Sequence, residues 1–115
     1  HRFWKHEWMR HGTCSNLTEV PFFLTGLHLR NEYPALEILQ ASGLKKGRKY
    51  PLDIFLQSIN NYIGYKPILV CRGRLLEQLE QLELCFFGNT GVYRIADCPA
   101  DIPNECGNLS NTIRY

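Results

Sequence analysis

The sequence has no apolar run long enough to cross a membrane, no internal repeat and no low-complexity tract. It also lacks a strong charge of one sign: 13 Lys and Arg against 11 Asp and Glu leave a net charge of +2, which neither requires nor excludes a polyanionic partner. Residues 1–8 lack the apolar stretch of a secretory signal, as a mature secreted chain would. The composition, 44% hydrophobic over 115 residues, is that of one globular domain, and we expect no membrane partner.

None of the five cysteines belongs to a CxxC pair of the kind that binds zinc. Four of them fall within the last 45 residues, among strand and turn signals: Cys71, Cys85, Cys98 and Cys106. This pattern is typical of disulfides formed in an oxidising compartment, whereas Cys14 stands far from the cluster with no evident partner. Glycosylation sequons at Asn16 and Asn108 agree with such a compartment.

Apolar spacing, prolines and glycines indicate four helices before Gly64. We expect them over residues 2–11, 21–29, 35–40 and 51–63. The last is the clearest, because its apolar residues recur at helical spacing and Gly64 ends the run. A basic loop at residues 45–49 precedes it. Such a loop is usually only solvated, and contact with RNA phosphates is the alternative.

Beyond Gly64 the pattern changes to that of strands. Residues 67–71 are apolar and β-branched, Leu82, Leu84 and Phe86 alternate with other residues, and a turn at 88–91 leads to a partner strand at 92–98. Helices followed by an antiparallel hairpin predict an α+β domain with helices packed on an antiparallel sheet. Two strands and an edge are too little sheet to stand alone, so residues 1–115 are expected to be a single partial domain.

Chemically useful side chains gather in residues 3–14, FWKHEWMRHGTC. On a helix, Glu7 shares a face with His11, His6 shares a face with Arg10, and Glu7 also adjoins Arg10. An imidazole can take the proton from a 2′-hydroxyl, and a fixed cation can hold a phosphate. The spacing therefore predicts one patch suited to RNA cleavage.

Less specific interpretations compete with this one. A helix with His, Glu and Arg on one side is most often a solvated surface, with Trp4 and Trp8 on its buried side. A His-Glu pair also begins a zinc-protease signature, but that signature needs histidines four residues apart. His6 and His11 are five apart, roughly 140° around a helix, so we expect neither a metal nor another cofactor.

Residues 3–14 closely resemble the second active-site segment of the ribonuclease T2 family, secreted acid ribonucleases of fungi, plants and animals. The family segment is Phe-Trp, one variable residue, His-Glu-Trp, one variable residue, Lys-His-Gly-Thr-Cys, and all fixed positions but one match. A weaker likeness continues at residues 64–68 (GYKPI), 82–85 (LELC) and 97–99 (DCP). The chain therefore resembles the C-terminal half of this fold.

The resemblance implies a role for each matching residue. His11 corresponds to the general base toward the 2′-hydroxyl, Glu7 to a supporting carboxylate and His6 to a phosphate-binding histidine; Trp4 is expected to contact substrate with His6. Arg10 stands where the family has the lysine that stabilises the transition state, and a planar guanidinium is not equivalent to an ammonium.

The resemblance also implies which cysteines form disulfides, and it shows that one active-site segment of the family is missing from this sequence. It implies the disulfides Cys71–Cys106 and Cys85–Cys98. Cys14 would pair with a cysteine from an upstream part of the fold. The family's first active-site segment, His-Gly-Leu-Trp-Pro, supplies the other catalytic histidine and is not in this sequence. His28 lies in an apolar run and is better explained as a structural or surface histidine.

The expected function is that of an endoribonuclease that cleaves single-stranded RNA through a 2′,3′-cyclic phosphate, secreted or carried to a vacuole or lysosome. We expect this chain alone to be almost inactive and to work with an N-terminal chain of the same enzyme, linked by a disulfide. The alternative is a catalytically silent relative with a storage, recognition or carbohydrate-binding role. Retention of His6, Glu7 and His11 argues against it, and Arg10 leaves it open.

Overall fold

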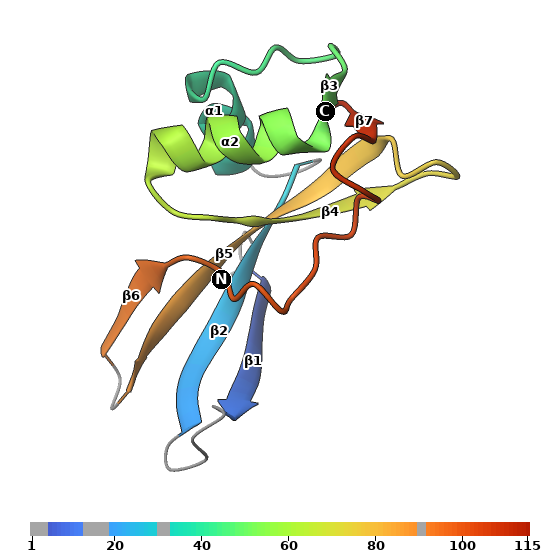
Figure 1. The fold of residues 1–115 in the computed structure, drawn as a ribbon. Helices are drawn as coiled ribbons and strands as arrows, with labels where there is room; N and C mark the ends of the chain where they lie inside the picture. The colour runs from blue at the N-terminus through green and yellow to red at the C-terminus, as the bar shows by residue number, and fades with distance from the viewer. Residues whose placement is uncertain (1–4, 13–18, 30–32, 90–91) are drawn as a thin grey trace.

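The computed structural model describes residues 5–12, 19–29, 33–89 and 92–115. Within these ranges both helices lie over one end of the larger sheet, and β1 and β6 extend away from them (Figure 1). The predicted α+β class, with helices packed on an antiparallel sheet, is confirmed. The elements in chain order are β1 (Lys5–Gly12), β2 (Glu19–His28), α1 (Tyr33–Ala41), β3 (Tyr50–Pro51), α2 (Leu52–Ile63), β4 (Ile68–Arg72), β5 (Gln78–Asn89), β6 (Val92–Ala96) and β7 (Thr112–Ile113).

The larger sheet is organised around β5. Its strand order is β1-β2-β5-β4, and β6 also pairs with β5, beyond the end of β4. Each pairing is antiparallel: β4 faces the first half of β5, with Ile68 opposite Glu83, and β6 faces the second half, with Cys85 opposite Ala96. A small second sheet pairs β3 with β7 and so brings the end of the chain back to the start of α2.

Two of the predicted helices are wrong. The segment predicted as a helix over residues 2–11 is β1 from Lys5 onward, and the one predicted over residues 21–29 lies in β2. A short apolar run fits a buried strand as well as a buried helix, and Val20, Phe22 and Phe23 are residue types that favour strands. Pairing decides the outcome, because β2 is hydrogen-bonded to β1 on one side and to β5 on the other. The sheet therefore has five strands, where the sequence predicted two and an edge.

The other two helices are confirmed. Helix α1 contains the predicted residues 35–40, and α2 spans Leu52–Ile63 and ends at Gly64, whose φ of 87° is the left-handed conformation that glycine adopts easily. The start of α2 has no side-chain cap. Instead, the backbone N–H groups of Leu52 and Asp53 donate to the carbonyls of Asn111 and Leu109, at 2.8 and 3.0 Å. The C-terminal segment thus supplies acceptors that the helix itself cannot.

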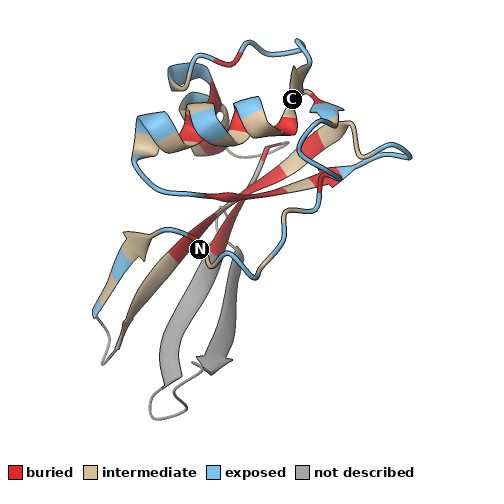
Figure 2. Ribbon diagram, in the orientation of Figure 1, coloured by how far each residue is buried: buried red, intermediate tan, exposed pale blue. Residues whose placement is uncertain are grey.

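The main core lies where the helices face the sheet, as the red segments of Figure 2 show. Leu27, Leu39, Phe55 and Leu82 are completely buried there. The rings of Tyr50 and Tyr115 meet Phe55 edge-on, with centroids 5.6 and 6.4 Å away. A smaller cluster joins Ile68 to the disulfide Cys85–Cys98.

An irregularity between β4 and β5 adjusts which residues reach the main core. The register shifts between Val70 and Cys71, so that Gln81 and Leu79 face them and Glu80 is the additional residue. Without this bulge, Leu79 and Leu82 would be on opposite faces of β5, because strand positions alternate. With it, both are buried in the main core.

Candidate functional site

The four residues expected to catalyse lie on β1, at one end of the strand order. Their positions are fixed by the pairing of β1 with β2. His6 is opposite Thr25, Glu7 opposite Leu24, Arg10 opposite Pro21 and His11 opposite Val20. Trp4, expected to contact substrate, lies outside the described residues.

A strand spreads these residues further than the predicted helix would. It advances about 3.3 Å per residue, against about 1.5 Å in a helix. Glu7 and His11 are therefore about 13 Å apart along β1 instead of one turn apart. Alternate positions of a strand face opposite sides, so Glu7 and Arg10 are also divided between the two faces. The single helical patch predicted from the spacing is corrected to two sets of positions: 6 and 10 on one face, 7 and 11 on the other.

The structure describes His28 but not Cys14. His28 ends β2 opposite Gln81, three residues beyond Thr25, which pairs with His6. Cys14 and the sequon at Asn16 lie outside the described residues. Their expected disulfide and glycan stay predictions.

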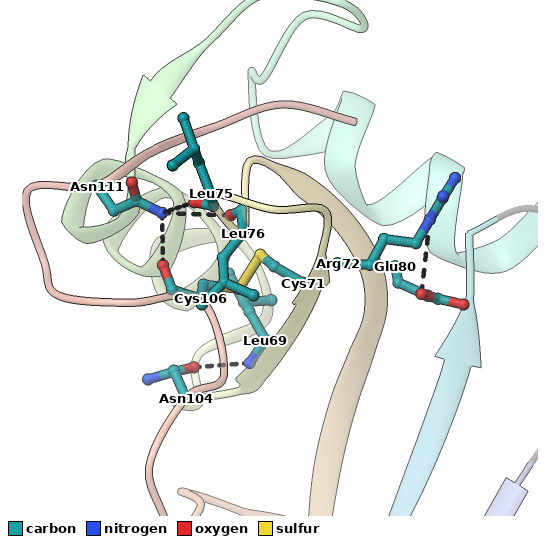
Figure 3. Close-up of a disulfide and its surroundings, with 9 residues drawn as sticks. All are labelled: Leu69, Cys71, Arg72, Leu75, Leu76, Glu80, Asn104, Cys106 and Asn111. Carbon is teal, nitrogen blue, oxygen red and sulfur yellow. Dashed lines mark hydrogen bonds and ion pairs between the residues drawn. A yellow bond between two sulfur atoms is a disulfide. The ribbon is translucent and has the colours of Figure 1, made fainter.

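The two disulfides have the pairing that the resemblance implies. Cys71 on β4 is bonded to Cys106, with the Cα atoms 4.9 Å apart, and Cys85 on β5 is bonded to Cys98, just after β6, with the Cα atoms 5.1 Å apart. Cys106 and Cys85 are completely buried. The first bond attaches the C-terminal segment to β4 (Figure 3), and the second closes the hairpin of β5 and β6.

The second sequon occupies an exposed turn. The side-chain carbonyl oxygen of Asn108 accepts hydrogen bonds from the backbone N–H of Ser110 at 3.0 Å and from its hydroxyl at 2.7 Å. Asn108, Leu109 and Ser110 are all exposed, and the turn begins two residues after the disulfide at Cys106. The acceptor asparagine is therefore accessible in a turn of fixed geometry.

Among the clefts formed by the described residues, two lie outside the histidine motif. The larger, of about 520 Å³, lies between α2, the start of β4 and the loop after β6. Two of its polar groups bind backbone: Asp97 accepts from the N–H of Lys66 at 2.8 Å, and Asn104 accepts from the N–H of Leu69 at 2.6 Å (Figure 3). In the described ranges, no three His, Cys, Asp or Glu side chains are grouped as a metal site requires.

The smaller cleft, of about 270 Å³, is lined by the basic loop and by Arg72, a residue that the sequence analysis did not identify. Lys46 of the loop and Arg72 of β4 both line it. The sequence shows that Arg72 is positively charged but not which residues surround it, because its surroundings depend on how β4 pairs with β5. The loop residues Lys45, Lys46, Arg48 and Lys49 are exposed, as either interpretation of the loop requires.

Two ionisable groups in this region have shifted pKa values. Backbone N–H groups of Glu77 and Leu75 lower the pKa of the Glu77 carboxyl, and the charges of Arg114 and Lys49 lower it further. Burial raises the pKa of Tyr115, and nearby Tyr50 adds to this effect. The hydroxyl of Tyr115 donates to the carbonyl of Leu44.

The fold and the motif define a disulfide-bonded α+β protein that carries two histidines, a glutamate and an arginine on the outermost strand of its sheet. A comparison with family models identifies it further: the ribonuclease T2 family matches residues 1–98. The chain belongs to the ribonuclease T2 family.

Individual relatives with similar sequences are also named as ribonucleases. Intracellular ribonuclease LX of Solanum lycopersicum is 31% identical over 102 residues, covering 85% of this chain and 42% of the relative. Ribonuclease 1 of Arabidopsis thaliana is 33% identical over 110 residues (91% and 47%), and ribonuclease T2-A of Mus musculus is 32% identical over 95 residues (74% and 37%). The chain thus spans about half the length of the curated relatives it matches, or less.

Among solved structures, trichomaglin, described as a novel S-like ribonuclease, is similar to this chain. It has a TM-score of 0.46 and 19% sequence identity, and the match covers 68% of this chain and 34% of trichomaglin. In the described part of the chain, no helix is both long enough and apolar enough to span a membrane.

Proposed function

We propose that this chain carries one part of the active site of an endoribonuclease that cleaves single-stranded RNA. The observation that carries the proposal is the segment at residues 3–14 in a chain of the ribonuclease T2 family, with His6, Glu7 and His11 all retained. We propose further that residues 1–115 correspond to the C-terminal half of one domain. The relatives' names state ribonuclease activity, and this chain matches about half of their length.

The chemistry is an internal phosphoryl transfer. His11 takes the proton of a 2′-hydroxyl, the freed oxygen attacks the adjacent phosphorus, and the bond to the 5′-oxygen of the next nucleotide breaks. A general acid gives that oxygen a proton, and water later opens the 2′,3′-cyclic phosphate. Imidazoles suit such transfers because their pKa lies near neutrality. His6 binds the phosphate, Trp4 contacts the substrate beside it, Glu7 supports the reaction, and Arg10 stabilises charge on the phosphate oxygens.

The general acid is the component that this sequence does not supply. No His-Gly-Leu-Trp-Pro segment occurs in it, and His28 belongs to a different strand, β2, outside the motif. We therefore propose that the 115-residue chain by itself has little or no activity. A second chain of the same enzyme, linked through Cys14, would complete the site.

The location follows from the covalent features. Two buried disulfides and an exposed sequon turn suit a protein that is secreted, or delivered to a vacuole or lysosome along the same route. The names of the Solanum lycopersicum relatives include both an intracellular and an extracellular ribonuclease, so relatives of this chain differ in location.

The decisive variant is His11→Ala in the complete protein. We expect kcat for a single-stranded RNA to fall by about 100-fold to 10,000-fold, the contribution typical of a general base, while RNA binding and the thermal unfolding midpoint stay nearly unchanged. His28→Ala is the matched control, since it removes an imidazole outside the motif and should leave kcat within a few-fold.

Two results would contradict the proposal. Unchanged turnover in His11→Ala would refute the role of His11, and rapid cleavage by the pure 115-residue chain would refute the need for a second histidine segment. RNA binding without cleavage by the complete parent protein would favour the catalytically silent alternative, which the replacement of lysine by Arg10 leaves open.

A further inference from the structure

The smaller cleft is the place where positive charge gathers from several elements. It lies between the loop that precedes β3 and the paired ends of β4 and β5, and its volume is about 270 Å³. Its lining combines two cations, a carboxylate, an amide and an apolar floor. The residues are Leu29, Leu36, Lys46, Arg72, Gln78, Leu79, Glu80 and Tyr115. We call it the cationic cleft.

The two cations of this cleft come from different elements. Lys46 belongs to the loop, whereas Arg72 ends β4 and its side chain is 56% exposed. Arg72 is oriented by an ion pair between its Nε and the carboxylate of Glu80, at 3.6 Å. In Figure 3 the outer nitrogens of the guanidinium point away from Glu80. The planar fork that binds a phosphate therefore projects from the strand.

Further cations extend the charge on both sides of the cleft. The loop contributes exposed Lys45, Arg48 and Lys49 and has no acidic residue, and Arg74 is exposed in the turn between β4 and β5. Arg114 lies between them, because its N–H donates to Glu77 while the next residue accepts from Gly47. Together these are seven of the chain's 13 Lys and Arg residues.

Acidic groups reduce this charge only in part. Glu80 is paired with Arg72, the carboxylate of Glu77 accepts the N–H of Leu75 at 3.1 Å, and Glu37 follows Leu36 on α1. The loop is also fixed in place. Lys45 N–H donates to the Tyr50 hydroxyl at 3.1 Å, and Gly47 N–H donates to the Tyr115 carbonyl at 2.9 Å.

We propose that the cationic cleft binds the phosphate backbone of single-stranded RNA outside the histidine motif. The inference rests on the proposed ribonuclease function for the choice of RNA as the polyanion. Lys46 and Arg72, which both line the cleft, contact phosphates, and the loop cations attract the flanking nucleotides. The two cations of the lining recognise phosphate, which every nucleotide carries, so we expect the contact to depend little on base sequence. The cleft strengthens binding of long RNA and contributes nothing to a dinucleotide.

The test measures binding without turnover, so that it is separate from the test of catalysis. Fluorescence anisotropy with single-stranded polyuridylate would compare the parent chain with Lys46→Ala/Arg72→Ala. Each lost phosphate contact lowers the salt slope by about 0.7 and, at 0.1 M salt, the affinity by about 5-fold. We expect the double variant to bind about 25-fold more weakly, with a salt slope reduced by about 1.4.

The matched control removes equal charge elsewhere. Lys66→Ala/Arg94→Ala changes two exposed cations, one before β4 and one on β6, and should keep the parent affinity to within a few-fold. Because Arg72→Ala also breaks the ion pair with Glu80, a second variant, Lys46→Ala, changes the loop alone and is expected to lose one phosphate contact, an affinity loss of about 5-fold. Thermal unfolding of each variant checks the fold.

Three outcomes would overturn the proposal. Equal losses in the cleft and control variants would show that only net charge matters. An unchanged affinity in the cleft variants would place the RNA elsewhere. Tighter binding to vesicles of anionic phospholipid than to polyuridylate would identify a membrane surface as the partner. A chain that binds RNA through the cleft but is inactive in its complete form would refute the catalytic proposal and leave this one standing.

Discussion

Tyr115 links the loop, the core and the end of the chain. It is 7% exposed, its ring meets Phe55, and its hydroxyl donates to the carbonyl of Leu44. Burial favours the neutral phenol, which is why its pKa is raised in the folded protein. A side chain whose ionisation is opposed by the fold makes stability depend on pH.

We therefore predict a loss of stability in alkali. The unfolded chain ionises Tyr115 near a pKa of about 10, whereas the folded chain holds the proton to higher pH. The contribution of the neutral Tyr115 to the free energy of unfolding is complete below pH 10 and is lost as the pH rises from 10 toward the higher pKa of the folded chain. In that window the free energy of unfolding falls by up to about 1.4 kcal/mol per pH unit.

Urea unfolding at a series of pH values would measure this dependence. Tyr115→Phe should flatten the alkaline decline, although it lowers stability at neutral pH because the Leu44 carbonyl loses its donor. Tyr62→Phe, at a tyrosine that is 56% exposed, should keep the parent slope. An equal slope in all three proteins would show that Tyr115 is not responsible.

The residues of the histidine motif could be identified from the sequence because their identities and order are specific. Their arrangement could not, since Glu7 and His11 share a side of both a helix and a strand but lie at different separations in each. The role of Arg72 in a cleft could not be predicted for another reason. Arg72 and Lys46 line the same cleft only because β4 pairs with β5, and no local sequence pattern specifies that pairing.

At the scale of elements, the two disulfides differ in what they connect. Cys71–Cys106 spans 35 residues and attaches the C-terminal segment to β4 in the main core. Cys85–Cys98 spans 13 residues and closes a hairpin that β5 and β6 already form. Loop entropy assigns about 4 kcal/mol to the longer link and about 3 kcal/mol to the shorter one.

Replacing each pair with alanines should therefore have unequal effects. We predict that Cys71→Ala/Cys106→Ala lowers the free energy of unfolding more than Cys85→Ala/Cys98→Ala, by about 1 kcal/mol or somewhat more, because the first change also frees the segment that caps α2. Guanidinium unfolding midpoints of the two variants would measure the difference. The reverse order would mean that the hairpin, and not the C-terminal segment, depends more on its covalent link.

Elements with a complete local signal were predicted well. Helix α2 has a proline start, apolar spacing at Leu52, Phe55 and Ile59, and a glycine end, and it formed within the predicted limits. Strand β2 has an apolar run that begins with Pro21, which suggested a helix start, so its local pattern fitted a helix equally well. The central position between β1 and β5 is a tertiary property, and it overrode the local preference.

At the scale of the whole molecule, the proposed second chain linked through Cys14 leads to a prediction about mass. Natural material should contain a species heavier than this chain that releases it on reduction. Intact mass spectrometry before and after reduction would show this, with alkylated Cys14 in the released chain as the identifying mark. A single mass in both conditions would exclude the linked second chain. Digestion with a glycosidase in the same experiment would reveal a glycan at Asn108.

The C-terminal segment has a further consequence for the order in which the protein is made. Residues 104–115 contact β4, β5, β3, the start of α2 and the basic loop, all of which are synthesised earlier. Until residues 104–115 have been synthesised, the first N–H groups of α2 lack the carbonyls of Leu109 and Asn111, and Cys71 lacks Cys106. This segment therefore completes the start of α2 and the covalent link to β4 only after the rest of the described fold has been made.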